Sequence, residues 1–193
     1  MNVKFVRHAE TTDNAECRLQ GPETRTFTQR GERELILLAS ELEKFHFDVV
    51  YSSDLPRCLY TADRIAPKNS INHLVLLREK NNGNLSGQPA LSIDWDALPG
   101  TFETRKLPGG ESLIDVRNRA QEFWNLLSSQ NANTVLVIGH GAFLKILFGL
   151  FQELSLCDSI FNLHIDHCSI SEVELRSHGQ TEFISMNETS HLR

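Results

Sequence analysis

Two short, mostly apolar runs in this chain each end abruptly at a histidine, and this repeated arrangement constrains the fold more than any other feature. Residues 3–6 read Val-Lys-Phe-Val and lead into Arg7-His8, and residues 134–138 read Thr-Val-Leu-Val-Ile and lead into Gly139-His140-Gly141. Runs of this length are typical of strands buried in a parallel sheet. Both histidines are therefore expected at the carboxyl ends of strands, the edge at which open α/β sheets bind ligands.

The residue types at these two strand ends suit a bound anion. A neutral imidazole such as that of His8 is a nucleophile, and the neighbouring Arg7 guanidinium can hold two phosphate oxygens at once. His140 precedes an apolar segment, residues 142–150, which predicts a buried helix whose first amides and dipole favour negative charge. Each motif alone also fits a structural role, in which the histidine caps its strand and bonds to backbone.

Two further strands are predicted to bring polar side chains to the same edge. A strand–helix unit places Arg57 in the first turn of its helix, where the helix dipole disfavours a cation unless an anion binds nearby. The next predicted strand delivers Arg78-Glu79 to the same edge, and the Glu79 carboxyl is suited to protonate a leaving oxygen. The alternative interpretation is that Arg78 and Glu79 form a solvated surface pair.

The order of the predicted elements indicates an α/β fold. Alternating strands and helices imply a three-layer α/β/α sandwich with a mostly parallel sheet, and the last two strands are expected to add an antiparallel edge through a turn at residues 177–180. The chain is expected to form a single domain, residues 1–193, in which residues 80–108 cover the pocket as a lid. The predicted strands span residues 2–7, 48–52, 73–78, 134–138, 161–175 and 181–187, and the predicted helices span residues 28–46, 55–66, 111–130 and 141–151.

Six segments of the chain occur in an order that is typical of one family. They are Arg7-His8-Ala9-Glu10-Thr11, Phe27-Thr28-Gln29-Arg30-Gly31, Ser52-Ser53-Asp54-Leu55-Pro56-Arg57 with Thr61-Ala62, Leu77-Arg78-Glu79 with Gly83, Pro108-Gly109-Gly110-Glu111-Ser112, and Gly139-His140-Gly141. From Val3 to about Leu192 the chain resembles the histidine phosphatase superfamily, which has the phosphoglycerate mutase-like fold.

This resemblance implies a phosphatase that needs no metal and no other cofactor. His8 would be the nucleophile that becomes phosphorylated, and Arg7, Arg57 and His140 would hold the phosphoryl oxygens. Glu79 would protonate the leaving group and then activate water against the phosphohistidine. The two arginines are expected to lower the pKa of His8 and keep its ring neutral. The expected reaction is hydrolysis of a small phosphorylated metabolite.

The same resemblance implies further contacts with the substrate. The end of the chain resembles the Asn-x-x-x-His-Leu ending of the family's small-metabolite phosphatases, which include phosphoserine phosphatases and α-ribazole phosphatase-like proteins. His191 is therefore expected to reach the substrate, unless the tail is disordered. The phosphoserine enzymes have a histidine shortly after the acid, whereas this chain has Asn81-Asn82. The predicted substrate-binding residues are Asn14, Arg18, Gln20, Gly21, Gly141 and His191.

The predicted lid favours hydrolysis over mutase chemistry. Residues 81–104 contain no lysine or arginine, whereas a phosphoglycerate mutase must bind a second anionic group. The family's mutases also have an asparagine where this chain has Ala142. Trp95 and Phe102 are expected either to line a substrate cavity or to pack the lid onto the body. The alternatives that stay open are a phosphoglycerate mutase, a phosphoprotein phosphatase and a non-catalytic phosphate-binding relative.

Composition limits the partners and the location. The net charge is −6, from 25 acidic and 19 basic residues, which argues against nucleic acid as a partner. Four cysteines without framework spacing, and a strand that leaves no room for a signal peptide, predict a cytoplasmic protein. No apolar run approaches the ~20 residues of a membrane span. His164 and His167 are expected on opposite faces of a strand, so no metal site is predicted. Nothing indicates the oligomeric state.

Overall fold

Six strands form one sheet in the computed structural model, which describes residues 1–176 and 180–193. The strands are β1 (Asn2–Arg7), β2 (Val49–Ser53), β3 (Ile71–Leu74), β4 (Thr134–Gly139), β5 (Ile170–Leu175) and β6 (Thr181–Glu188). Their order across the sheet is β3-β2-β4-β1-β5-β6. The first four strands run parallel, while β5 is antiparallel to both β1 and β6. The predicted parallel sheet with an antiparallel edge is therefore confirmed.

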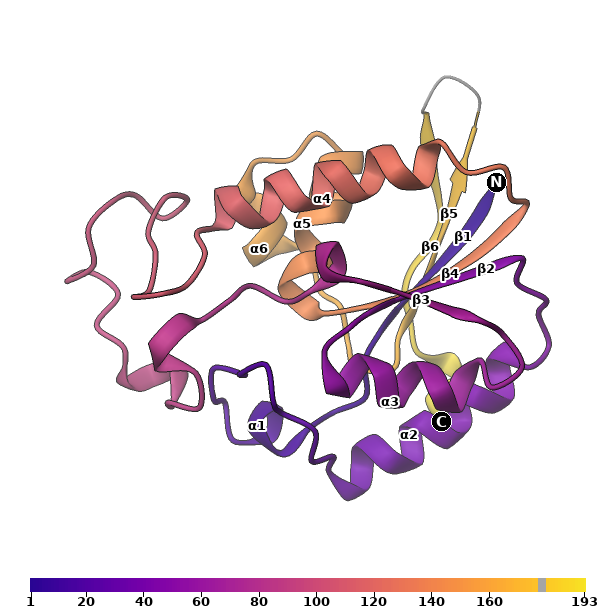
Figure 1. Ribbon diagram of the computed structural model, residues 1–193, viewed down its shortest axis with the longest axis horizontal. Coiled ribbons are helices and arrows are strands. Elements are labelled where there is room, and N and C mark those ends of the chain that lie inside the picture. The colour runs from indigo at the N-terminus through magenta and orange to yellow at the C-terminus, as the bar shows by residue number, and fades with distance from the viewer. Residues whose placement is uncertain (177–179) are drawn as a thin grey trace.

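Helices cover both faces of this sheet and complete the predicted three-layer sandwich (Figure 1). One face is covered by α2 (Gln29–Leu42) and α3 (Pro56–Ile65), and the other by α4 (Leu113–Ser128), α5 (Gly141–Phe151) and α6 (Leu156–Asn162). Each face has its own apolar core, with Leu38 and Val50 on the first side and Phe123 and Phe148 on the second. The one-turn helix α1 (Thr12–Ala15) lies in the loop between β1 and α2.

The helices begin where side chains bind their first amides. The Thr28 hydroxyl accepts a hydrogen bond from the Gly31 amide at the start of α2, and Ser112 and Asp115 form a reciprocal capping box at the start of α4. Pro56 occupies the first turn of α3, where its missing N–H removes no helical hydrogen bond. These local signals fix the residues at which the helices begin.

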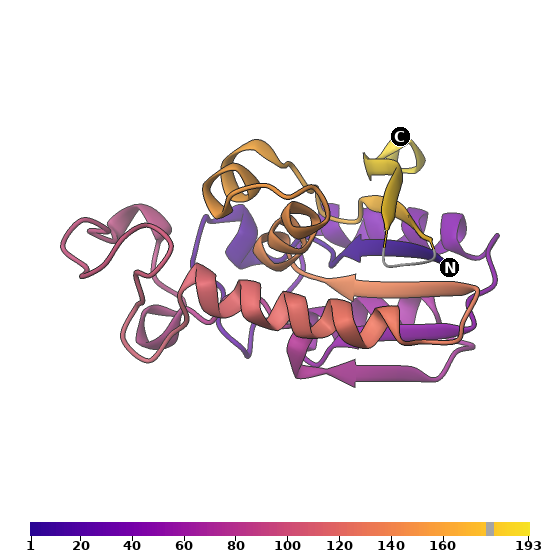
Figure 2. The ribbon, with the colours of Figure 1, turned by 90° about the horizontal axis from the view of Figure 1, so that it is seen from above.

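The carboxyl ends of the parallel strands point toward one end of the molecule. Figure 2 shows the arrowheads of β1, β3 and β4 directed toward the side on which residues 80–112 project from the body. This segment contains the 3₁₀ turns η2 (Gly83–Leu85) and η3 (Ala90–Ser92). It lies where a cover for the pocket was expected, and its action as a lid stays a prediction.

The third predicted strand is shorter than expected. The prediction was residues 73–78, whereas β3 begins two residues earlier and ends at Leu74. The 3₁₀ turn η1 (Val75–Leu77) follows it. The physical reason is that its neighbour β2 ends at Ser53, which pairs with Leu74, so the residues beyond have no ladder to join. Glu79 therefore follows a tight turn, not a strand.

The predicted strand over residues 161–175 is wrong in its first part. The helix α6 continues to Asn162, and β5 begins only at Ile170. The Ser155 hydroxyl accepts a hydrogen bond from the Asp158 amide at 3.0 Å, which caps α6. This Ser-x-x-Asp pattern is present in the sequence and favours a helix. The alternation of apolar and polar residues that follows it had indicated a strand.

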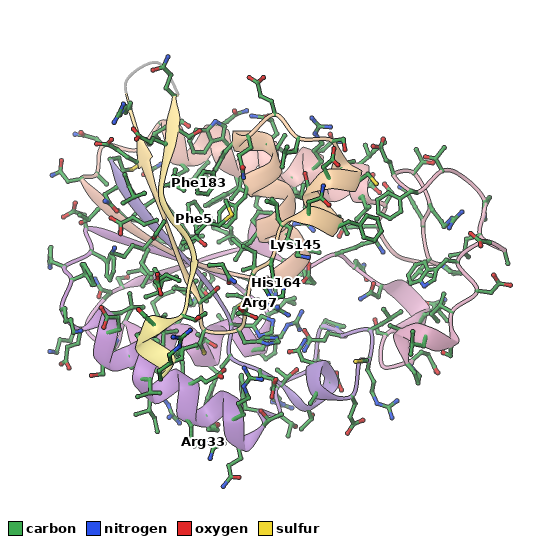
Figure 3. All side chains as sticks on the ribbon, turned by 180° about the vertical axis from the view of Figure 1, so that it is seen from behind. Phe5, Arg7, Arg33, Lys145, His164 and Phe183 are labelled. Carbon is green, nitrogen blue, oxygen red and sulfur yellow. The ribbon has the colours of Figure 1, made fainter. Side chains whose placement is uncertain are left out.

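Aromatic side chains dominate the core between the sheet and the helices α4 and α5. Phe5 and Phe183, labelled in Figure 3, each lie with their ring centroids 5.3 Å from that of Phe148. Gly149 permits the packing of α6 on α5, because a Cβ atom there would lie 1.8 Å from Oγ of Ser159. The apolar run of α5 is thus interrupted by glycine for a steric reason.

The chain ends beside α2, where the turn η5 (Ser190–Leu192) packs (Figure 1). The predicted turn at residues 177–180 falls on residues 177–179, which lie outside the described residues. Among the helices that the structure describes, none is long and apolar enough to span a bilayer.

Candidate active site

His8 follows β1 directly, and its ring is buried. Its Nδ1 lies 2.8 Å from the carbonyl oxygen of Ala9, which can only accept a hydrogen bond, so Nδ1 carries the proton. Nε2 of the neutral ring therefore presents a lone pair. Within the described part of the chain this buried atom has no hydrogen-bond partner. Buried polar atoms in folded proteins are nearly always paired, so Nε2 is open to a water molecule or a ligand.

The surroundings of His8 keep its ring uncharged. Burial lowers the pKa of His8 well below its usual value of 6.5, and the positive charges of Arg57 and Arg7 lower it further. The direction agrees with the prediction, but desolvation is a larger cause than the two arginines to which the shift was ascribed. The imidazole is thus neutral at physiological pH.

His140 follows β4 and faces His8, with the two ring centroids 5.1 Å apart. Its Nδ1 accepts a hydrogen bond from Nε of Arg57 at 3.2 Å, so its Nε2 carries the proton and donates to Oγ of Ser53 at 2.9 Å. Arg57 is buried and also donates to the carbonyl of Gly21 at 2.9 Å. The ends of β1, β2 and β4 and the start of α3 therefore meet at one point, as predicted.

Arg7 ends β1 under the first turn of α5. Its Nη1 donates to the carbonyl of Ile165 at 2.7 Å, and its buried Nε has no partner among residues 1–176 and 180–193. Gly141 leaves room for this side chain, because a Cβ atom there would lie 3.1 Å from Cζ of Arg7. Gly139 carries no such constraint, since a Cβ atom there would meet Leu144 at an ordinary 3.5 Å.

Glu79 binds the amino terminus of α5. Its carboxylate accepts hydrogen bonds from the amides of Ala142 at 3.1 Å and Phe143 at 3.2 Å. The sequence had indicated that these amides would receive a substrate anion, but the chain's own carboxylate occupies them. Arg119 holds the same turn, because it contacts the Glu79 carbonyl at 3.4 Å and pairs with Glu111 at 2.8 Å. The predicted acid is therefore fixed beside the strand ends.

A cavity of about 270 Å³, which we call the catalytic cavity, adjoins the site at Arg57 and Glu79, while His8, Arg7 and His140 lie behind its lining. Its lining includes Gln20, Gly21, Arg57, Glu79, Lys80 and Arg119. Two of the predicted substrate-binding residues, Gln20 and Gly21, thus lie at the cavity. Arg78 lines it as well, but its guanidinium is engaged by the Asp54 carboxylate at 2.7 Å.

Two predicted substrate-binding residues are used elsewhere. The Asn14 side chain accepts a hydrogen bond from the Thr11 amide at 3.1 Å, as part of the cap of α1. Arg18 lies at the surface, where it pairs with Glu16 at 2.7 Å and donates to the carbonyl of Gly87 at 3.0 Å. Neither residue lines the catalytic cavity.

The tail histidine lies away from the catalytic cavity. Nε2 of His191 is 3.0 Å from the carbonyl oxygen of Cys168. The residue lines a separate hollow beside α2 that also includes Lys4 and Glu41. In this conformation the tail closes the edge of the fold and does not contact the site to which its motif was assigned.

His167 joins the site, although it was predicted only as part of a strand. It lies in the loop before β5, with its ring centroid 5.7 Å from that of His8, and its buried Nε2 has no partner in the described residues. Burial lowers the pKa of His167 to about 3, and Arg7 contributes to the shift. His164 instead bonds Asp166 at 2.9 Å in this loop. No local motif marks His167, because the pairing of β5 with β1 brings it here.

The chain is similar to known proteins over most of its length. The model of the histidine phosphatase superfamily (branch 1) matches residues 3–189. Phosphoserine phosphatase 1 of Hydrogenobacter thermophilus is 30% identical, over 97% of this chain and 92% of its own. A protein named "Probable phosphoglycerate mutase GpmB" from Escherichia fergusonii is also 30% identical, over 90% of this chain and 85% of its own. The solved α-ribazole phosphatase from Shigella flexneri aligns with a TM-score of 0.85 at 20% identity, over 97% of this chain and 96% of its own.

These findings bear on the fold and the family. The solved structure agrees with the predicted phosphoglycerate mutase-like fold, and the family model spans nearly the whole chain. The chain therefore belongs to the histidine phosphatase superfamily and is a phosphoric monoester hydrolase of that family.

Proposed function

We propose that the chain hydrolyses small phosphorylated metabolites without a metal, through a phosphohistidine formed at Nε2 of His8. One observation carries this proposal. Nε2 is buried, has no partner within the described residues, and bears the lone pair because Nδ1 donates to the carbonyl of Ala9. The lowered pKa of His8 supports the proposal further, because only the neutral ring is a nucleophile.

The neighbouring groups supply donors for the phosphoryl oxygens. Nε of Arg7 is a buried donor without a partner in the described part of the chain, and Nε2 of His167, buried and unpartnered beside His8, donates in the tautomer that carries its proton there. Arg57 adds its guanidinium. A phosphate dianion entering between Arg57 and His140 would replace their contact, and its charge would favour a protonated, donating imidazole. Charge accumulates on these oxygens in the transition state, so fixed cations around them lower the barrier.

The reaction takes two steps. In the first step, the Nε2 lone pair of His8 forms a bond to phosphorus while the bond from phosphorus to the alcohol oxygen breaks, and Glu79 gives its proton to that oxygen. In the second step, water attacks phosphorus and passes a proton to Glu79. The P–N bond breaks, its electron pair returns to Nε2, and inorganic phosphate leaves. Both residues are then in their starting protonation states.

Phosphoglycerate mutase chemistry is the second candidate, because one relative that is 30% identical carries that name. A mutase needs cations for a second anionic group; residues 81–104 contain none and include Asp94, Asp96 and Glu103, so the projecting segment offers cations only at its two ends, at Lys80, Arg105 and Lys106. Hydrolysis is therefore preferred. Sustained interconversion of 2- and 3-phosphoglycerate with a bisphosphate primer would reverse this preference. Turnover of phosphopeptides but not of metabolites would instead favour a phosphoprotein phosphatase.

The nucleophile is tested by replacing His8 with alanine. We expect hydrolysis of p-nitrophenyl phosphate to fall by about 10³-fold or more, and acid-labile phosphate to vanish from rapidly quenched protein. The matched control is His46→Ala, since the His46 side chain is 89% exposed and should leave both readouts unchanged. Residual activity of His8→Ala within about tenfold of the wild type would contradict covalent catalysis by this residue.

A further inference from the structure

A second cavity of about 510 Å³ lies beside the catalytic one, and we call it the annex. Its lining includes Trp95, Phe102, Arg105, Leu113, Ile160 and Phe161. These residues come from the projecting segment, from the start of α4 and from α6. The volume lies within the ~300–1,000 Å³ range of small-molecule pockets.

The annex is continuous with the place where the alcohol of a substrate must leave. Lys80 and Asn82 line both cavities. Ala142 lines the annex, while its amide donates to the Glu79 carboxylate at 3.1 Å. The ester oxygen of a substrate, which takes a proton from Glu79, would therefore lie where the two cavities meet. The rest of the alcohol would extend from that oxygen into the annex.

The annex presents aromatic surface that the protein itself leaves uncovered. The rings of Phe102 and Phe161 stack with centroids 5.2 Å apart, yet these side chains are 40% and 68% exposed. Trp95 contributes a third aromatic ring, with the Lys80 ammonium 6.0 Å from its centroid. Exposed apolar clusters of this kind mark ligand or partner sites, and flat rings bind other flat rings well.

Two cations interrupt this apolar lining, Lys80 at the junction with the catalytic cavity and Arg105 further along it. The Arg105 side chain is only 20% exposed, and its buried Nε has no partner among the residues that the structure describes. Its nearest carboxylate, that of Asp96, lies 3.5 Å from Nη1 and is almost fully exposed. A buried guanidinium N–H without an acceptor is costly, so a ligand oxygen is expected to complete this contact.

We propose that the annex binds the alcohol part of the substrate, and that this part is a flat aromatic body carrying a carboxylate that reaches Arg105. The inference rests on the proposed phosphatase function and adds its substrate class. The phosphoryl group lies at His8, the ester oxygen at Glu79, the ring between Trp95 and the Phe102–Phe161 stack, and the carboxylate at Arg105.

The aromatic part of the proposal is tested by kcat/KM for 2-naphthyl phosphate and phenyl phosphate, whose alcohols leave with similar ease. We expect the wild type to prefer the larger ring by about tenfold or more, and Trp95→Ala to lose most of that preference. The matched control is Leu91→Ala, because Leu91 lies in the same segment, is 96% exposed and is outside the annex lining. Equal kcat/KM values for both substrates in the wild type would overturn the proposal.

The carboxylate part is tested with 6-carboxy-2-naphthyl phosphate. Arg105→Gln should raise KM for this substrate by about tenfold and leave KM for 2-naphthyl phosphate within about twofold, since only the first has an oxygen for the guanidinium. An equal rise for both substrates would mean that Arg105 supports the fold of the segment, and would overturn its role in recognition.

A binding measurement separates this inference from the proposed function. The chain has two tryptophans, Trp95 and Trp124, so 2-naphthylmethylphosphonate should change the fluorescence of His8→Ala but not that of the double variant lacking Trp95. If the phosphonate binds in this way but the wild type hydrolyses no phosphate ester, the annex stands as a binding site and the proposed phosphatase function is wrong. If the wild type hydrolyses phenyl phosphate but does not prefer 2-naphthyl phosphate, the proposed phosphatase function stands and the proposed role of the annex is wrong. A change in oligomeric state on Trp95→Ala would show that the rings bind another copy, and would overturn the proposal.

Discussion

Replacement of Gly141 by alanine tests whether Arg7 must keep its observed position. Gly141 lies at the first position of α5, directly after His140, and the Arg7 guanidinium packs against its backbone. The substitution adds one methyl group and changes no charge. Its effect on activity should therefore come only from the displacement of the guanidinium relative to His8.

The size of the effect follows from the geometry. The added carbon would lie 3.1 Å from Cζ and 3.2 Å from Nε of Arg7. Non-bonded carbon atoms pack best at about 3.5–4.0 Å, so the guanidinium must move by about half an ångström. Since a misplacement of 1 Å costs about 10²-fold in rate, we expect kcat to fall about tenfold, or ~1.4 kcal/mol in the barrier. Stability should not follow, because alanine is favoured over glycine in helices by up to about 1 kcal/mol.

The assay compares kcat for p-nitrophenyl phosphate with the midpoint of urea unfolding in two variants. Gly139→Ala is the matched control, because its Cβ atom meets Leu144 at an ordinary contact distance of 3.5 Å. We expect Gly141→Ala to lose activity at unchanged stability and Gly139→Ala to keep both. Wild-type kcat in Gly141→Ala, or the same loss in both variants, would refute the reasoning.

Three further predictions concern the acid, the buried histidines and the tail. Glu79→Gln cannot donate the proton, so we expect kcat/KM, which reports the phosphorylation step, to fall by about 10²–10⁴-fold with alkyl phosphates and much less with 2,4-dinitrophenyl phosphate, whose alcohol needs no acid; equal losses in kcat/KM would contradict this role. Burial lowers the pKa of His8 and of His140 well below 6.5 and that of His167 to about 3, so the unfolded chain binds more protons as the pH falls through about 6.5, and each of these three histidines should remove about 1.4 kcal/mol of stability between about pH 7.5 and 5.5. Urea unfolding at the two pH values measures this loss, and a flat profile would argue against neutral buried rings. His191→Ala should cost about 1 kcal/mol of unfolding free energy and leave KM unchanged, because its ring bonds the carbonyl of Cys168; a raised KM would mean that the tail reaches the substrate.

Local sequence signals predicted the elements that end at sharp chemical boundaries. The strands β1 and β4 are apolar runs that stop at Arg7 and at Gly139, and the structure ends them at these residues. The same reasoning was wrong for residues 161–169, because alternation of apolar and polar residues there resembles a strand while a serine cap upstream initiates α6. Competition between a helix cap and a strand pattern is decided by packing, here by Ser159 against Gly149, which no short window contains.

The candidate site divides in the same way. Arg7, His8 and His140 were predictable because each lies next to the end of a strand, and all parallel strands of a sheet end at one edge. His167 and Arg105 were not, because their positions depend on the return of β5 alongside β1 and on the course of an irregular segment. Long-range pairing fixes such residues without leaving a local pattern.

Burial of the site produces both its reactivity and its cost. Removing His8 from water lowers its pKa and keeps the ring neutral, which a nucleophile requires. The same burial leaves Nε2 of His8, Nε of Arg7 and Nε2 of His167 without partners in the described chain, and burying such polar atoms costs folding free energy. A phosphoryl group can supply acceptor oxygens for Nε of Arg7 and the phosphorus atom that the lone pair of His8 Nε2 attacks. The burial that costs folding free energy is therefore also what makes these groups complementary to a phosphorus centre under attack by His8.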